Sequence, residues 1–395
     1  MRLNWRASRK SFGTALIGAG LAWGISGQVS GGDISRALAA TRVHPAQGLS
    51  PGDVPNFQNA KLEARAIHGS LGEEIERWAL SARKAQWLGY AVREVKGQRS
   101  MCCSDYGNNG SQRGCAACSL EDRRSAVSID SSGEKTGKVR LESVSEMAVM
   151  YRAENGKGGK IRTFSLGCAA DAGGLDVLWL EGVAAGESVK LLERFVTSDG
   201  ASGEGHDSLG KGALTALALD DDPSADRAME SFVSPNRPEW LRRETAFWLG
   251  EARGAAGLRA LEKMAKDDPS PHVREQVAFA LSLSAEPGAL SEMIRMARDD
   301  PDGHVRGQAL FWLAEKAGKK AESVISGAIE NDPDTEVKKK AVFALSQMPP
   351  DEGVPKLIEV ATTNRNSEVR KQAMFWLGQS NDPRALAFFE KVLTQ

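Results

Sequence analysis

Histidine and cysteine are scarce in this 395-residue chain, which contains five of each. The chain also lacks a P-loop, a dinucleotide-binding glycine fingerprint and any recognisable Ser-His-Asp arrangement. These are the patterns by which nucleotide-dependent enzymes and many hydrolases are recognised. The sequence therefore offers no catalytic residue and no cofactor site.

An excess of charge of one sign is missing as well. The chain has 51 Lys and Arg against 52 Asp and Glu, a formal net charge of −1. This balance gives no electrostatic reason to expect a nucleic acid as partner. Long apolar runs are absent after the amino-terminal segment, so we expect no membrane span once that segment is removed.

The amino terminus has the order of an export signal. The stretch MRLNWRASRK carries four basic residues and no acid, and FGTALIGAGLAWGISG follows it. Small residues then offer cleavage after Ser26 or Ala39. We interpret 1–27 as an export signal peptide and the Gly-, Ser-, Pro- and Ala-rich 28–60 as a linker, which predicts a periplasmic or secreted protein. A retained anchor or a disordered tail is the alternative.

Five segments of the carboxyl-terminal half share one pattern at a constant spacing of 32 residues. They read LRRETAFWLG, VREQVAFALS, VRGQALFWLA, VKKKAVFALS and VRKQAMFWLG, and they begin at Leu241, Val273, Val305, Val337 and Val369. LGKGALTALAL from Leu209 fits the same phase without the phenylalanine. Each unit carries two apolar stripes at helical spacing. Since neither helix can bury its stripe alone, the sequence predicts an α-solenoid of about six units over 208–395.

The pattern DP-x-x-x-V-R followed by an A/V-x-F-x-L helix resembles short HEAT-like repeats of the phycobilisome-lyase type, found in many bacterial repeat proteins. The match is good over 240–395 and poor over 208–239. The resemblance implies a mainly α superhelix. Two HEAT-like families are enzymes, but no histidine of this chain precedes a glutamate, as the iron sites of deoxyhypusine hydroxylase require. Nothing marks the bilin site of a phycobilin lyase.

Charged residues recur at the junctions between units. An Asp or Asn stands before the proline position, and a basic residue follows six positions later. We interpret these residues as a structural ladder, in which the acid caps a helix and the basic residue reaches the carboxylate of its own or the adjacent unit. The ladder comprises Asp268, Arg274, Asp300, Arg306, Asp332, Lys338 and Arg370. His272 and His304 stand where helices begin and are read as capping or surface residues.

A helix turns by about 100° per residue, and on this projection one phenylalanine per unit lies almost opposite the apolar stripe of the first helix. Such a row either forms an exposed strip that binds a partner or is covered by the neighbouring unit, and the sequence leaves both open. The row comprises Phe247, Phe279, Phe311, Phe343 and Phe375. The residue that follows each phenylalanine is alternately Trp and Ala. It falls on the apolar stripe, so we expect it to lie in the core.

The front half predicts a small β-rich α+β domain over 61–198, followed by a linker at 199–207. An Asn-Gly turn between two alternating runs is a strong hairpin signal. The expected elements are a helix at 61–82, a strand at 87–95, a hairpin around Asn155-Gly156, a strand at 175–180 and a helix at 187–196.

Four of the five cysteines lie in MCCSDYGNNGSQRGCAACSL. Cys115-x-x-Cys118 has the spacing of half a zinc site, but Cys102 and Cys103 are adjacent and diverge on an extended backbone. Behind an export signal, disulfides are favoured, with a metal site and redox thiols as alternatives. The front domain resembles the portion before the repeats in some secreted bacterial HEAT-repeat proteins. That resemblance implies that Cys102, Cys103, Cys118 and Cys168 form the paired set, with Cys115 extra.

Together these patterns predict an exported, non-enzymatic protein-interaction module or scaffold without a cofactor. Its protein partner is not identified by the sequence. The alternative is a metal- or redox-active enzyme subunit that uses the cysteine loop. A third reading is self-association through the last repeat, where Phe388 and Phe389 leave an apolar end.

Overall fold

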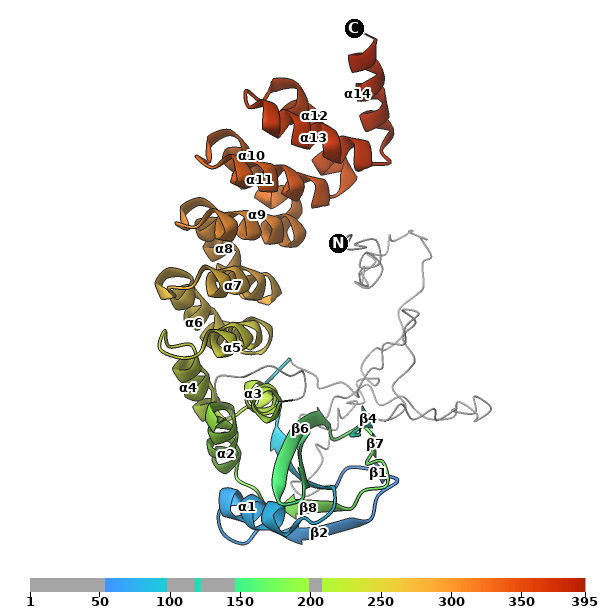
Figure 1. Ribbon diagram of the computed structural model, residues 1–395, viewed down its shortest axis with the longest axis vertical. Coiled ribbons are helices and arrows are strands. Elements are labelled where there is room, and N and C mark those ends of the chain that lie inside the picture. Colours follow the sequence, from blue (N-terminus) through green and yellow to red (C-terminus); the bar gives the residue numbers. More distant parts are fainter. Residues whose placement is uncertain (1–53, 98–117, 122–145, 199–207, 395) are drawn as a thin grey trace, which may run out of the picture.

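The computed structural model describes residues 54–97, 118–121, 146–198 and 208–394, and the structural statements below concern these residues. A small sheet domain lies at one end of a curved stack of helices (Figure 1). The fold is therefore mainly α, with a helical superhelix preceded by a β-rich domain, as the sequence predicts.

The main sheet has five strands in the order β2-β8-β3-β5-β6. β2, β8 and β3 are parallel neighbours, whereas β5 pairs antiparallel with β3 and β6. Asn155 and Gly156 join β5 to β6 with φ of 52° and 75°, so the predicted hairpin is confirmed. The bounds are β2 (Leu62–Ala66), β3 (Gln86–Arg93), β5 (Glu146–Glu154), β6 (Lys157–Ser165) and β8 (Val177–Glu181).

The sheet has a hydrophobic core on each face. Along β3, Leu88 and Tyr90 point to the helices, whereas Trp87 enters a second core on the opposite face. The helices are α1 (Leu71–Ser81) and α2 (Ala185–Ser198). The second core is covered by three two-residue strands, β1 (Phe57–Gln58), β7 (Ala170–Asp171) and β4 (Cys118–Ser119).

Two boundaries differ from the sequence expectation. Residues 62–66, expected to be helical, form β2 because they pair with β8, and the helix starts only at Leu71 after the cap Ser70. The linker expected over 28–60 ends earlier, because β1 pairs with β7 and Phe57 packs against the second core.

The solenoid consists of twelve described helices that form six pairs. The first helices are α3 (Leu209–Leu219), α5 (Glu239–Ala252), α7 (Pro271–Leu283), α9 (Gly303–Ala317), α11 (Thr335–Gln347) and α13 (Ser367–Gln379). The second helices are α4 (Pro223–Phe232), α6 (Gly254–Asp267), α8 (Gly288–Asp299), α10 (Glu322–Asn331), α12 (Pro350–Thr363) and α14 (Pro383–Leu393). A 3₁₀ turn, η2 (Gly318–Ala321), precedes α10. Figure 1 shows α5, α7, α9 and α11 on the inner side of the arc, with α6, α8 and α10 on its outer side.

Sheet domain and solenoid share one core. The first hydrophobic cluster runs without a break from α1 and the sheet to α14. α3 lies so close to β6 that a Cβ on Gly212 would stand 2.6 Å from the carbonyl oxygen of Ile161. Val95 also donates its N–H to the carbonyl of Leu219 at 2.9 Å. Within the described residues, no helix combines the length and apolar character needed to cross a bilayer.

Candidate protein-binding surface

Eight aromatic rings form a continuous row across the first helices α5, α7, α9, α11 and α13. Neighbouring ring centroids are 4.7 to 6.2 Å apart. This aromatic row comprises, in spatial order, Trp248, Phe247, Phe279, Trp312, Phe311, Phe343, Trp376 and Phe375. Ring contacts of this kind contribute about 0.5–1.5 kcal/mol each beyond burial.

The alternation of Trp and Ala gives the row a two-unit period. Phe311 and Phe343 of adjacent units stack face to face, with an interplanar angle of 3° and a centroid distance of 5.7 Å. At the next junction, Phe343 instead meets Trp376, tilted by 40° at 4.8 Å. The tryptophans thus bridge the junctions at which phenylalanines do not stack directly.

The row is both stacked and accessible. Phe247, Phe279, Phe311 and Phe343 each contact a ring of a neighbouring unit, yet all four are only half-buried. Phe375 contacts Trp376 of its own helix and is 53 % exposed. The stacked rings are therefore partly covered by their neighbours and partly accessible, and binding of a partner to the row stays a prediction. The tryptophans, expected in the core, lie at its edge.

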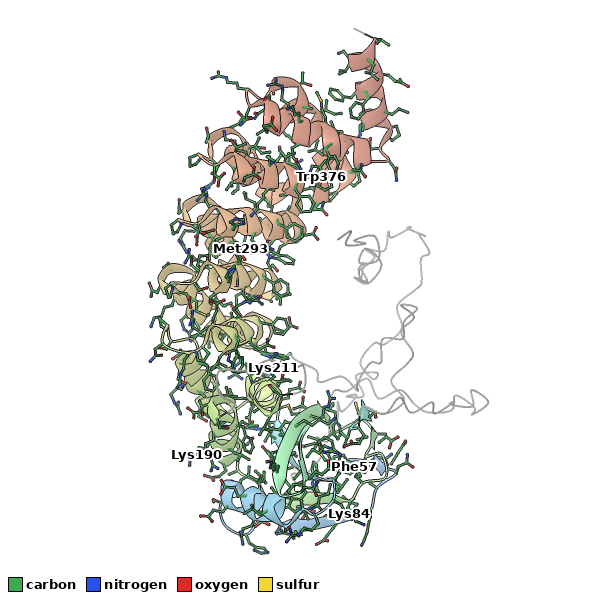
Figure 2. The ribbon with its side chains drawn as sticks, in the orientation of Figure 1. Phe57, Lys84, Lys190, Lys211, Met293 and Trp376 are labelled. Carbon is green, nitrogen blue, oxygen red and sulfur yellow. The ribbon has the colours of Figure 1, made fainter. Side chains whose placement is uncertain are left out.

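Most of the row belongs to helices on the inner side of the arc, α5, α7, α9 and α11 (Figure 1), and Figure 2 labels Trp376 at the carboxyl-terminal end of the row. Half-buried polar side chains stand three residues before each phenylalanine: Glu244, Gln276, Gln308, Lys340 and Gln372. The surface thus combines an apolar strip with hydrogen-bonding groups along its border.

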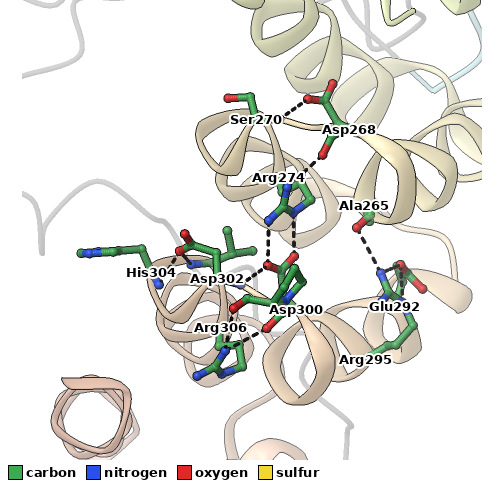
Figure 3. A network of polar contacts seen from close by, with 12 residues as sticks. Ala265, Asp268, Ser270, Arg274, Glu292, Arg295, Asp300, Asp302, His304 and Arg306 are labelled. Carbon is green, nitrogen blue, oxygen red and sulfur yellow. Dashed lines mark hydrogen bonds and ion pairs between the residues drawn. The ribbon is translucent and has the colours of Figure 1, made fainter. Parts of the chain in front are cut away.

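The predicted charge ladder joins adjacent units through buried forks (Figure 3). Arg274 donates Nε and Nη2 to Asp300 at 2.8 and 3.0 Å, and its Nη1 donates to the carbonyl of Asp268 at 2.9 Å. Arg306 binds Asp332 in the same way. The hydrogen bond to Asp300 raises the pKa of Arg274. Burial opposes ionisation of Asp332, yet the hydrogen bond from Arg306 lowers the pKa of that carboxyl.

Among the described residues, no such fork joins the last two units. Lys338 donates to the carbonyl of Glu330 at 2.7 Å rather than to the next loop, where Asn364 replaces the aspartate. Arg370 donates to the carbonyls of Asn364 and Arg365 at 2.8 and 3.1 Å. A buried ion pair adds little net stability, but displacing one partner is strongly destabilising, so we expect the ladder to set the register of the units.

The cysteine loop lies largely outside the described residues. Cys102, Cys103 and Cys115 fall there, and only the backbone of Cys118 is described, in β4. Cys168 is buried and disulfide-bonded. The pairing implied by the resemblance remains a prediction. In the described part of the chain, no group of three or more His, Cys, Asp or Glu residues is placed to hold a metal.

A buried polar cluster at the junction of sheet and solenoid was missed by the sequence analysis. Tyr90 Oη lies 3.2 Å from Ser188 Oγ, and Asp220 is fully buried beside them. Burial raises the pKa of Asp220 to about 6. Arg253 Nη1 donates to the carbonyl of Asp220 at 2.7 Å. The only sequence signal was the acidic run Asp220-Asp221-Asp222, which reads as a solvated loop.

Comparison with known proteins identifies the repeats. Residues 234–314 and 322–395 match the family model of HEAT repeats. No curated protein matches the chain. Among solved structures, it is similar to human deoxyhypusine hydroxylase in complex with glycerol, at 18 % identity over 53 % of this chain and 80 % of that one, with a TM-score of 0.28.

The complex of CpcE and CpcF of phycocyanin lyase from Nostoc sp. PCC7120 is similar at 20 % identity over 40 % of this chain and 100 % of that one, with a TM-score of 0.30. Likeness at this level says nothing about what this chain binds. The family match and the paired helices lead to one conclusion: the arc from residue 234 to residue 395 is a solenoid of HEAT repeats.

Proposed function

We propose that this protein is an exported, non-enzymatic scaffold that binds a protein partner along the aromatic row. The observation that carries the proposal is a continuous strip of half-exposed rings on the inner helices. Contiguous apolar surface rimmed by polar groups is typical of protein-binding sites. Aromatic residues are enriched in such sites because they bury a large area at a small entropic cost.

An extended segment in the polyproline II conformation fits the spacing of this surface. That conformation rises about 3.1 Å per residue with three residues per turn, so one face recurs about every 9 Å. Packed helices are spaced about 8–10 Å apart. One apolar side chain per turn therefore recurs at about the spacing of the helices, while the phenylalanine rings themselves pair at 6.2 and 5.7 Å at alternate junctions. The bordering glutamines, such as Gln276 and Gln308, offer hydrogen bonds to the exposed backbone of the ligand.

The cysteines and the amino terminus support export. Disulfides persist in oxidising compartments, and Cys168 is disulfide-bonded. The basic and apolar order of the first residues points the same way. The competing proposal, a metal- or redox-active subunit, predicts stoichiometric zinc or free thiols in protein exported by its own signal. Intact mass with and without reduction, together with a metal assay, distinguishes the two.

The binding proposal is tested with Phe311→Leu plus Phe343→Leu. Leucine keeps most of the apolar volume but removes the stacked faces, so the units stay folded while the strip is interrupted. The probe is a synthetic peptide of about four Pro-Pro-Leu triplets, whose leucines recur once per turn. We expect its affinity, followed by tryptophan fluorescence, to fall by roughly tenfold or more.

The matched control is Leu80→Ala, an exposed apolar position on α1 that lies outside the solenoid. It should leave peptide affinity unchanged. Equal affinity of wild type and double variant for the peptide would show that the aromatic row is not the binding surface. A peptide with Ser in place of Leu should bind weakly, and strong binding of that peptide would contradict the spacing argument.

A further inference from the structure

The main sheet ends on one side in strand β2, which among the described residues pairs with β8 alone. Successive residues of a strand direct their backbone groups to opposite sides. The carbonyl of Lys61 accepts the N–H of Val177 at 2.9 Å, and Ile67 donates its N–H to the carbonyl of Glu181 at 3.0 Å. The odd-numbered residues therefore face β8. The N–H and C=O groups that point away from the sheet belong to Leu62, Ala64 and Ala66.

This edge has neither of two features that often block the addition of a strand. Proline and β-bulges interrupt many exposed edges in native proteins. β2 contains no proline and keeps a continuous register with β8 over all five residues. It lies at the end of the molecule opposite to α14 (Figure 1). The edge can therefore accept a further strand without rearrangement of the sheet.

The side chains of β2 divide between two faces of the sheet. Arg65 donates Nη2 to Glu74 of α1, and Ile67 packs against the first core, so the odd-numbered residues lie on the face that carries α1. Glu63 lies on the same face, is exposed, and has no hydrogen-bonded or ionic partner within the described residues. One acidic and one basic side chain thus flank Ala64 on one face.

We propose that β2 pairs antiparallel with β2 of a second copy of this chain, about a two-fold axis through Ala64. In this register Ala64 lies opposite Ala64, and Leu62 of each copy lies opposite Ala66 of the other. Each of these pairs exchanges both of its N–H···O bonds, so every outward backbone group of β2 obtains a partner. The two five-stranded sheets become one continuous sheet.

The charges on β2 favour this register over its neighbours. Between the hydrogen-bonded pairs, opposing side chains approach most closely. With the axis at Ala64, Glu63 of each copy lies opposite Arg65 of the other, and opposite charges stabilise such a pair. Nε and Nη1 of Arg65 are available for this contact, because Nη2 alone binds Glu74.

A slip of the register is disfavoured by the same two residues. Sliding one strand by two residues in either direction sets Glu63 against Glu63 or Arg65 against Arg65, and like charges at these positions are destabilising. The register centred on Ala64 is therefore the one that pairs all five residues of β2 and matches both charges. This self-complementarity is what a two-fold contact between identical chains requires. The inference is independent of the aromatic row and of what binds there.

The first test is sedimentation equilibrium of the full chain from about 1 to about 300 µM, a range suited to a micromolar dissociation constant. The weight-average mass should rise toward twice the monomer mass and then level off. Ala64→Pro removes the outward N–H at the axis and leaves the bonds to β8 intact, so it should raise the dissociation constant by roughly tenfold or more. Ala64→Val is the matched control, because it keeps this N–H and suits a strand, and it should not weaken association.

The second test is a charge exchange across the axis. Glu63→Arg alone sets two arginines opposite each other, and Arg65→Glu alone sets two glutamates opposite each other. Each variant should associate roughly tenfold or more weakly than wild type. An equimolar mixture of the two variants restores opposite charges in both pairs, so it should form a mixed dimer with an affinity near that of wild type.

Circular dichroism checks that each variant is folded, since Arg65→Glu also loses the bond to Glu74. If that variant does not fold, Glu63→Arg mixed with wild type replaces it. One of its two charge pairs is then matched, so its affinity should lie between those of the two homodimers.

Hydrogen exchange at β2 supplies an independent readout. The amides of Leu62, Ala64 and Ala66 should exchange more slowly as the protein concentration rises. A chain that stays monomeric at the highest concentration would contradict the proposal, and so would a Glu63→Arg variant that associates like wild type. Slow exchange of the three amides in a monomer would mean that another segment of the same chain covers the edge, which also overturns it.

Discussion

At the scale of single residues, Asp220 couples pH to stability. Its carboxyl is buried between the sheet domain and the solenoid, and burial raises its pKa from 3.8 to about 6. A raised carboxyl pKa means that the folded state holds the proton more tightly than the unfolded state. The stabilisation is fully present below about pH 4 and is lost as the pH rises through about 6.

Asp220→Asn should therefore stabilise the protein at neutral pH. Asparagine keeps the acceptor that Asp220 Oδ1 offers to the N–H of Asp222 at 2.9 Å, but it carries no charge to desolvate. We expect the free energy of unfolding of the variant to exceed that of wild type by on the order of 1–3 kcal/mol at pH 7.5. Urea denaturation measures the difference.

The difference between variant and wild type should shrink toward pH 4, where Asp220 is protonated in wild type as well. Other carboxyls titrate over the same range, so the comparison of the two proteins isolates this group. A difference that is constant from pH 4 to pH 8 would show that the ionisation of Asp220 does not control stability at the junction.

At the scale of helices, α5 and α7 approach more closely than a methyl group allows. A Cβ on Gly250 would lie 2.1 Å from the carbonyl oxygen of Ala280. Gly250→Ala should force the two helices apart and destabilise the solenoid by on the order of 1–3 kcal/mol. Hydrogen exchange should show the loss of protection in α5 and α7 first, because each unit contacts only its neighbours.

Gly378 occupies the same phase in α13 and supplies the control. Its Cβ position has no neighbour nearer than 4.0 Å, so Gly378→Ala should gain helix propensity, up to about 1 kcal/mol. If both substitutions shift the unfolding midpoint in the same direction, the close contact between α5 and α7 does not limit stability.

Elements that depend on nearby residues could be predicted from the sequence, whereas elements that depend on distant partners could not. The solenoid helices were predictable because each carries its own apolar stripe, its caps and a 32-residue period. β2 was not, because it is a strand only through pairing with β8, more than a hundred residues later. KLEARAIHGSLGEEIERW by itself is equally compatible with a helix.

The same distinction applies to the candidate binding surface. The position of the phenylalanine row followed from helical phase, but its exposure depends on how rings of adjacent units stack. The acidic and basic partners of the ladder were recognisable, yet only the structure shows that Arg274 reaches forward to Asp300 of the next unit. Burial of Asp220 depends on the approach of β3, which no local pattern reveals.

At the scale of the whole molecule, the sheet domain serves as the cap of the solenoid. The shared core predicts that the fragment 208–395, expressed alone, exposes the face of α3 that normally meets β6 and α2. We expect α3 and α4 to lose hydrogen-exchange protection in this fragment, while α7 to α12 keep theirs. Identical protection of α3 and α4 in fragment and full chain would show that the two parts fold independently.

The charge ladder also has a mechanical consequence. Three guanidinium–carboxylate ion pairs, made by Arg242, Arg274 and Arg306, link adjacent units between about residues 235 and 337. Within the described residues, no such pair links the units after Lys338, which donates to a backbone carbonyl. Among the described side chains, the joint between α11 and α13 is instead linked by a single hydrogen bond from Asn366 Nδ2 to Thr335 Oγ1 at 3.2 Å, so we expect the arc to be stiffer over its middle units than toward α14. Under tension or thermal bending it should yield first at the joint between α11 and α13, so that the end bearing α14 can reorient while the aromatic row nearer the sheet domain keeps its shape.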